Sequence, residues 1–349
     1  MRELDEKQLA GRAAAVASHT WPGARITGLR RLEGGVSSLT YAAELQADGA
    51  APSPLVLKIA PPGLAPVRNR DVLRQARLLR RLAGLDGVPT PAVLFTDDGD
   101  PPLFAMQLCP GQSYEPALDH DSSPPAPEIA AIRMRCAARV LARMHRDTPA
   151  GLGLTEQPVM PVAEELDRWA RLFDTVDADL APGHQLLRDR LAERVPGDAG
   201  PRLLHGDYRL ANMLFVDSEL TGIIDWEIWS VGDPRTDLAW LLMHTAPAHV
   251  FHEHRSADDI AAGAGLPGRA ELLSEYVQAR REDGASAAGV TAETAELPWF
   301  LALSFYKTAA TTAAIIKRDR KRPVPDPKLV VAARHLDEVL AAGHAALDR

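Results

Sequence analysis

The sequence is poor in cysteine and lysine and has no long uninterrupted apolar run, and each shortage narrows what the protein can be. Its two cysteines, Cys109 and Cys136, are too few to brace a chain of 349 residues with disulfides, and they are not spaced like metal ligands. Residues 1–16 are charged and amphipathic and lack the apolar core of a signal peptide. These features together lead us to expect a cytoplasmic protein.

The charge balance and the longest apolar stretch argue against two kinds of partner. A formal net charge of -8 gives no electrostatic footprint for nucleic acid. The stretch 297–316 is interrupted by Lys307 and several threonines, which favours a buried helix over a membrane span. The basic run "KRDRKR", residues 317–322, is either a solvated helix end or an anion-binding edge for an acidic substrate. We expect neither nucleic acid nor a membrane as a partner.

Chain length and residue pattern predict two lobes, the first of them rich in strands. A chain of 349 residues exceeds what one hydrophobic core usually covers, and its composition is that of a globular protein. Apolar alternation and turn residues predict two strands within 29–45, a strand at 55–60, a helix at 71–83 and two strands within 88–111.

The second lobe is predicted to be mainly helical and to begin with a helix at 128–145. Short strands enclose the segment "HGDYRLAN", residues 205–212, and helices dominate from residue 237 onward. We therefore predict an α+β, bilobal fold. A small antiparallel-sheet N-terminal lobe covers 1–108, and a larger, mainly helical C-terminal lobe covers 109–349.

Polar residues in and after "HGDYRLAN" indicate phosphoryl transfer, which depends on cations and carboxylate-held metal more than on covalent chemistry. Asp207 and Asn212 are five residues apart, and Asp225 follows the next strand turn. The first carboxylate can orient and deprotonate a hydroxyl, while the amide oxygen of Asn212 and the carboxylate of Asp225 are the hard ligands that Mg²⁺ prefers.

A lysine and a glycine pair in the first lobe are candidates for phosphate binding. In "LVLKIA", alternation places Lys58 on the strand face opposite Leu57, where it either reaches solvent or meets a ligand. Gly34 and Gly35 form either an ordinary turn or a loop whose backbone N–H groups approach phosphates. Ser37 and Ser38 add hydroxyl donors.

These motifs, taken in order, resemble a known family. "HGDYRLAN" followed by "IIDWE" is similar to the signature of the aminoglycoside phosphotransferase and choline kinase-like superfamily, whose fold is protein-kinase-like. "EGGVSSLTY" resembles its phosphate loop, "MQLCPG" its interlobe connector and "GDPRTDLAWLL" the segment after the metal-binding Asp. The run "LKIAPPGLAP" also resembles kinase-like domains related to those fused to acyl-CoA dehydrogenases, which act on hydroxylated acyl groups.

The resemblance implies a role for each matching residue. Asp207 is the catalytic base, Asn212 and Asp225 bind Mg²⁺, and Lys58 contacts the phosphates of ATP or GTP. The backbone segment that meets the nucleobase comprises Met106, Gln107 and Leu108.

Three assignments near the catalytic loop follow less directly from the family pattern. Arg209 either meets the transferring phosphoryl group or makes a structural ion pair. His205 braces the loop, and Asp237 caps the helix "DLAWLL" and braces the same loop.

One position departs from the family pattern. The helix 71–83 aligns Gln75 where the family has a Glu that pairs with the strand lysine, and an amide accepts a hydrogen bond without offering a charge. Either Gln75 or a carboxylate such as Asp71 holds Lys58, or the protein is a degenerate, pseudokinase-like nucleotide-binding or regulatory protein. The catalytic loop favours the first reading because the base and both metal ligands remain.

The acceptor is predicted to be a small molecule. Asp225 and Asp237 are too close in sequence for a long peptide-docking segment. We therefore expect a Mg²⁺-dependent O-phosphotransferase that moves the γ-phosphate of ATP or GTP to a hydroxyl of an aminoglycoside, macrolide or hydroxyacyl-type acceptor. A metallohydrolase using His205, Asp207, Asp225 and His244 is a third reading, but it explains neither Lys58 nor Asn212. The sequence leaves oligomeric state open.

Aromatic residues are either core or part of a substrate pocket, with core the commoner outcome at these spacings. The residues concerned are Trp226, Trp229, Trp299, Phe300, Phe305 and Tyr306, and Lys307 belongs to the same candidate pocket wall.

Overall fold

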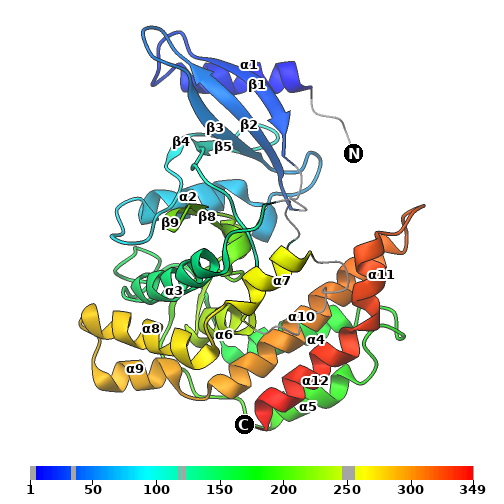
Figure 1. Cartoon of the computed structure of the whole chain (residues 1–349). Coiled ribbons are helices and arrows are strands. Elements are labelled where there is room, and N and C mark those ends of the chain that lie inside the picture. Colours follow the sequence, from blue (N-terminus) through cyan, green and yellow to red (C-terminus); the bar gives the residue numbers. More distant parts are fainter. Residues whose placement is uncertain (1–4, 33–36, 117–118, 120–122, 246–255, 349) are drawn as a thin grey trace. The chain divides into compact units, whose positions relative to one another are not determined.

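The computed structural model describes residues 5–32, 37–116, 119, 123–245 and 256–348, and its elements are labelled in Figure 1. The chain divides into two compact units. The first comprises 1–112, 214–216 and 220–228, and the second comprises 113–213, 217–219 and 229–349. The segment predicted as one C-terminal lobe, 109–349, therefore contributes short pieces to the first unit.

Backbone pairing explains why these pieces belong to the first unit. Gln112 and Phe215 exchange two backbone hydrogen bonds of 3.0 Å, and the N–H of Ile223 donates to Pro89 O at 2.9 Å. Gly111 has φ +110°, and a Cβ there would lie 2.4 Å from Phe215 O, so only glycine permits this close approach. Such long-range pairing leaves no local sequence pattern.

A five-stranded antiparallel sheet in the order β1-β2-β3-β5-β4 forms the centre of the first unit. The strands predicted from alternation are present, but the first of them begins at Arg25, before the predicted range 29–45. The elements of this unit are α1 (Glu6–Ala17), β1 (Arg25–Arg31), β2 (Leu39–Gln46), β3 (Ser53–Ile59), η1 (Arg68–Arg70), α2 (Val72–Leu82), β4 (Val93–Asp97), β5 (Leu103–Gln107), the paired strands β8 (Met213–Val216) and β9 (Glu219–Ile223), and η3 (Trp226–Ile228).

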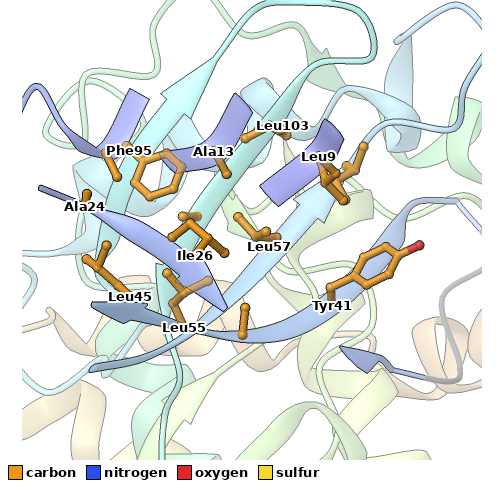
Figure 2. Close-up of a cluster of buried hydrophobic side chains, with 14 residues drawn as sticks. Leu9, Ala13, Ala24, Ile26, Tyr41, Leu45, Leu55, Leu57, Phe95 and Leu103 are labelled. Carbon is orange, nitrogen blue, oxygen red and sulfur yellow. The ribbon is translucent and has the colours of Figure 1, made fainter. Parts of the chain in front are cut away.

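The two faces of β3 have different environments, as its alternation predicts. Leu55, Leu57 and Ile59 are fully buried in a cluster with α1, and Figure 2 shows Leu9 and Ala13 of that helix over the same sheet face. Lys58 lies on the opposite face. Burial of one strand face against α1 thus fixes the direction in which the lysine points.

The second unit is mainly helical, with a small three-stranded sheet in which β10 pairs with both neighbours. Its elements are α3 (Pro127–Met144), β6 (Val159–Met160), α4 (Val162–Phe173), α5 (His184–Glu193), β7 (Arg202–Leu204), η2 (Leu210–Asn212), β10 (Ser230–Gly232), α6 (Arg235–Met243), α7 (Ala257–Ala264), α8 (Arg269–Glu282), α9 (Ala287–Thr294), α10 (Leu297–Asp319), α11 (Pro327–Arg334) and α12 (Leu336–Leu347).

Helix α10 forms the core of this unit and packs against α4, α5, α6, α11 and α12 (Figure 1). Among the described residues, one helical stretch, Ala287–Asp319, is long and apolar enough to span a membrane by composition alone. Of its most apolar window, 78% is buried inside the protein, so the expected buried helix is confirmed. The six aromatic residues singled out in the sequence are all buried, which favours the core interpretation.

Candidate active site

In the first unit, Lys58 is buried and faces two polar groups from other elements. Its Nζ lies 2.8 Å from Asp225 Oδ1 and 3.4 Å from the amide oxygen of Gln75 on α2. The predicted alignment of Gln75 with Lys58 is therefore right. Asp71, the alternative carboxylate, instead caps α2 through the Arg74 N–H and pairs with Arg77. Asp225 supplies the negative charge that Gln75 lacks.

Asp225 has a conformation suited to a ligand-binding position. Its φ of +63° lies in the left-handed region, which Asp tolerates better than most residues and which recurs at functional turns. Its side chain is 42% exposed although its partner Lys58 is buried. Because only Oδ1 contacts Lys58, Oδ2 is available to another cation.

The predicted phosphate loop is described only in part. Gly34 and Gly35 lie outside the described residues. Ser37 donates its hydroxyl to the Glu227 carboxylate, whereas the hydroxyl of Ser38 is buried without a hydrogen-bond partner in the part of the chain that the structure describes. Of the two serines, Ser38 therefore has the hydroxyl free for a ligand.

The backbone predicted to meet the nucleobase already makes hydrogen bonds in the first unit. The N–H of Gln107 donates to Ala92 O at 2.8 Å, and that of Leu108 donates to Pro54 O at 3.4 Å. Met106 pairs with Val56 in the sheet. Contact with a nucleobase at these three residues stays a prediction.

In the second unit, Asp237 holds the backbone of the loop that carries the catalytic candidate. Its fully buried carboxylate accepts hydrogen bonds from the N–H groups of His205, at 2.6 Å, and Gly206, at 3.0 Å. The expected bracing is thus present, but the expected helix cap is wrong. Helix α6 begins at Arg235 after Pro234, so Asp237 lies inside its first turn and points at the loop instead.

The Asp207 carboxylate accepts three hydrogen bonds from side chains of its own unit. Oδ1 accepts from the Trp240 indole at 2.9 Å and from Arg209 Nε at 3.2 Å, and Oδ2 accepts from Asn212 Nδ2 at 2.9 Å. Burial alone would raise the pKa of Asp207, but Arg209, Lys307 and two histidines outweigh it and hold that pKa well below its ordinary value. Asp207 is therefore ionised at neutral pH, as a base must be.

Arg209 forms the ion pair that the sequence offered as one of its two roles. Its pKa is raised, because the attraction of Asp207 and Glu115 exceeds the opposing effect of burial. Its Nε is engaged by Asp207, and no contact tests the alternative role toward a phosphoryl group.

Two further groups lie near the loop; Lys307 was expected only in a possible substrate-pocket wall, and Glu115 was not predicted at all. Lys307 of α10 donates to Gly206 O at 2.5 Å, and Glu115 accepts from the Ala211 N–H at 3.4 Å. Burial raises the pKa of Glu115 to about 7, with Asp119 adding to the rise and Arg209 opposing it. The signal for Lys307 was a charge within an apolar helix. Glu115 lies in a Pro- and Asp-rich segment that carries no such signal.

The residues predicted to hold Mg²⁺ have chemically suitable atoms. Asn212 uses its amide nitrogen on the backbone and carboxylate of Asp207, which leaves its carbonyl oxygen as a ligand. Asp225 offers Oδ2. Among the described residues, no group of three or more His, Cys, Asp or Glu side chains lies together as a metal site would require.

Comparison with known proteins agrees with this geometry. The sequence profile described as "Phosphotransferase enzyme family" matches residues 28–274, and the chain belongs to this family. It is 27% identical over 303 residues to the probable acyl-CoA dehydrogenase IBR3 of Arabidopsis thaliana, a match that covers 81% of this chain and 35% of that protein. The chain thus spans about a third of the length of this curated relative. Both resemblances drawn from the motifs are confirmed.

Solved structures confirm the protein-kinase-like fold. A crystal structure of a putative aminoglycoside phosphotransferase from Ralstonia eutropha superposes with a TM-score of 0.74 at 20% identity, over 99% of each chain. A ternary complex of aminoglycoside phosphotransferase APH(4)-Ia with AMP-PNP and hygromycin B has a TM-score of 0.58 at 14% identity, over 95% of this chain and 98% of that one.

Proposed function

We propose that this protein is a Mg²⁺-dependent O-phosphotransferase that moves the γ-phosphate of ATP or GTP to a hydroxyl group of a small molecule. The observation that carries the proposal is the Asp207 carboxylate, held by three donors on a loop that Asp237 braces. A general base needs this combination of fixed orientation and available charge. Membership of the phosphotransferase family supports the same reaction class.

Asp207 orients the acceptor hydroxyl and takes up its proton as the acceptor oxygen bonds to the γ-phosphorus. The bond from that phosphorus to the β–γ bridging oxygen breaks, and the nucleoside diphosphate leaves with the bonding electrons. Arg209, beside Asp207, is a cation available to the transferring group.

In the first unit, we assign the nucleotide phosphates to Lys58 and a cation to Asp225, whose side chains form an ion pair of 2.8 Å. Asn212 and Asp225 would supply oxygen ligands to Mg²⁺, which neutralises charge on the transferring phosphoryl group when bound. The AMP-PNP in the APH(4)-Ia complex supports nucleotide use by this chain.

The pseudokinase-like reading is less well supported. It rested on Gln75 in place of a Glu, but Lys58 has a carboxylate partner in Asp225 at 2.8 Å. The charge that fixes the lysine is therefore present at another position. The acceptor itself stays open among aminoglycoside, macrolide and hydroxyacyl types, and a cytoplasmic location without nucleic-acid or membrane partners remains part of the proposal.

The test is transfer of labelled γ-phosphate from ATP and GTP, with and without Mg²⁺, into pools of hydroxylated metabolites, lipids and antibiotics. We expect labelled product that needs Mg²⁺ and is reduced about 10² to 10⁴-fold by Asp207→Asn. Nucleotide binding with no transfer to any pool would instead favour the nucleotide-binding protein. Transfer by Asp207→Asn at the native rate would remove Asp207 as the base.

A further inference from the structure

Lys307 occupies an unusual position for a charged residue. It lies in the middle of the core helix α10 and is only 6% exposed. Burying an ammonium group is costly unless the surroundings compensate it. Burial does lower the pKa of Lys307, while Asp207, Glu165 and Asp237 oppose that effect. Among the described residues Lys307 has no salt bridge within 4.0 Å, so these carboxylates attract it from a greater distance and its direct contacts are with other groups.

The groups that contact Lys307 Nζ are one carbonyl and two indole rings. Its Nζ donates to Gly206 O, the residue directly before Asp207. The same Nζ lies 3.8 Å from the ring centroid of Trp240 and 5.3 Å from that of Trp169. A cation over the face of an indole is attracted by the ring quadrupole, and the attraction is stronger where water is excluded.

Trp240 connects this cation to the catalytic candidate. Its indole Nε1–H donates to Asp207 Oδ1 at 2.9 Å. A positive charge over the ring draws electron density from the indole and makes its N–H a better donor, since linked polar groups polarise one another. Lys307 therefore acts on both sides of Asp207, through the backbone at Gly206 and through the donor to the carboxylate.

We propose that Lys307 is a positioning residue for phosphoryl transfer, which holds the Asp207 carboxylate in its reactive orientation through the Trp240 indole and the Gly206 carbonyl. This inference rests on the proposed function, because that reaction is what requires a fixed carboxylate. A lysine that only filled space in α10 would not need to contact the Gly206 carbonyl or the Trp240 ring. Small misplacements of a reacting group are enough to slow a reaction strongly.

The activity test uses the full-length chain with MgATP and water as the acceptor, so that it does not depend on identifying the natural substrate. We expect Lys307→Met and Trp240→Phe each to lower kcat between about ten- and a hundredfold. KM for MgATP should stay within about twofold, because the change affects only the reacting carboxylate. Lys307→Arg, which keeps a cation near the ring, should recover part of the lost rate.

Trp299→Phe is the matched control. Trp299 is also a buried tryptophan of the second unit, and its indole donates to Leu191 O at the same distance of 2.9 Å. The Trp299→Phe variant loses one indole hydrogen bond, just as Trp240→Phe does, but this bond does not involve Asp207. We expect its kcat to match the wild type. An equal loss of kcat in this control would mean that the loss in Trp240→Phe comes from general destabilisation, and the proposal would be overturned.

A double variant tests whether Lys307 acts through Trp240. If it does, Lys307→Met combined with Trp240→Phe costs little more than the larger single effect, because both changes break one connection. If the loss of kcat in the double variant is instead the product of the two single losses, the two residues act independently and the proposed connection is wrong.

A spectroscopic readout separates failure of this inference from failure of the proposed function. In protein labelled at tryptophan nitrogen, Lys307→Met should make the Trp240 indole N–H exchange with solvent about tenfold faster and leave Trp299 unchanged. Unchanged exchange at Trp240 would overturn the positioning role even in an active enzyme. A wild type that transfers label to none of the acceptor pools would instead refute the proposed function, while the exchange rates would still show whether Lys307 holds the Trp240 N–H.

Discussion

Two buried lysines, one in each unit, differ in the groups that their ammonium nitrogens contact directly. Lys58 in the first unit makes an ion pair with Asp225, whereas Lys307 in the second unit contacts a carbonyl and the faces of two indoles. Both side chains are less than a tenth exposed. An ion pair can be exchanged for a ligand's charges, but a packed cation–π contact cannot be opened without disturbing the core.

The exposure of the partners supports this distinction. Asp225 is 42% exposed, so an incoming phosphate or cation can reach the Lys58 pair. Trp240 and Trp169 are buried with Lys307. We therefore expect Lys58 to act on nucleotide affinity and Lys307 to act on the rate of the chemical step.

The largest effect is expected from breaking the Lys58–Asp225 ion pair. Lys58→Met removes the phosphate-binding cation and leaves the Asp225 carboxylate unpaired, so kcat/KM for MgATP should fall about a thousandfold, equal to roughly 4 kcal/mol. Most of this loss should appear as weaker nucleotide binding, measured by calorimetric titration. Lys307→Met is the counterpart in the other unit, and an equal loss of nucleotide affinity there would erase the distinction.

Stability should be most sensitive to the carboxylate that holds the catalytic loop. Asp237→Ala leaves the N–H groups of His205 and Gly206 without their acceptor in a buried position, and we expect a loss of about 3 kcal/mol in the free energy of unfolding. Urea unfolding measures it. Asp326→Ala, which removes the exposed cap of α11, serves as the control and should cost about 1 kcal/mol. Equal losses would mean that the loop is held by other contacts.

Local patterns predicted the parts of the site that depend on one element. Alternation in β3 placed Lys58 on the face opposite Leu57, and alignment of α2 with the family pattern placed Gln75 beside it. The missed features each join residues far apart in sequence. Asp225 reaches Lys58 across 167 positions, and Lys307 reaches Gly206 across 101. No periodicity encodes such contacts.

The prediction for Asp237 failed for a related reason. An Asp before an apolar helix is a good cap by local rules, but α6 starts two residues earlier, and the carboxylate is used by the backbone of a distant loop. The domain boundary shows the same limit. The paired strands β8 and β9 join the first unit through contacts at Gln112 and Pro89, which the sequence pattern could not reveal.

Glu115 predicts a pH effect on stability in the second unit. A pKa raised from 4.5 to about 7 means that the folded protein keeps the proton at pH values where the unfolded chain releases it. Protonated Glu115 therefore makes its full contribution to the free energy of unfolding below pH 4.5, and this contribution is lost as the pH rises through 7. The whole shift corresponds to about 3 kcal/mol, of which we expect about 2 kcal/mol to be measurable.

Glu115→Gln tests this effect because it keeps an oxygen for the Ala211 N–H and removes the titration. The variant should be more stable than the wild type at pH 8 and equal to it near pH 4.5, by urea unfolding at both values. Parallel pH profiles for the two proteins would show that Glu115 does not titrate in this range.

The smallest effect is expected at the position that departs from the family pattern. Gln75→Glu adds a carboxylate near Lys58, but Asp225 already meets that charge at 2.8 Å, whereas Gln75 lies 3.4 Å away. The substitution also loses the amide donor to Asn69 O. We therefore expect KM for MgATP to change by less than about threefold, measured by steady-state phosphate transfer.

The direction of that small change decides between two ways of holding a lysine. If Asp225 alone is sufficient to hold Lys58, a second carboxylate only competes for the lysine. The effect of Gln75→Glu on the kinetics with MgATP then stays far smaller than that of Lys58→Met. An improvement of more than about tenfold in kcat/KM would instead mean that Gln75 limits the enzyme. Asp225 alone would then not hold Lys58 well enough to replace the missing Glu. Lys58 would bind nucleotide phosphates less tightly than its 2.8 Å contact with Asp225 suggests.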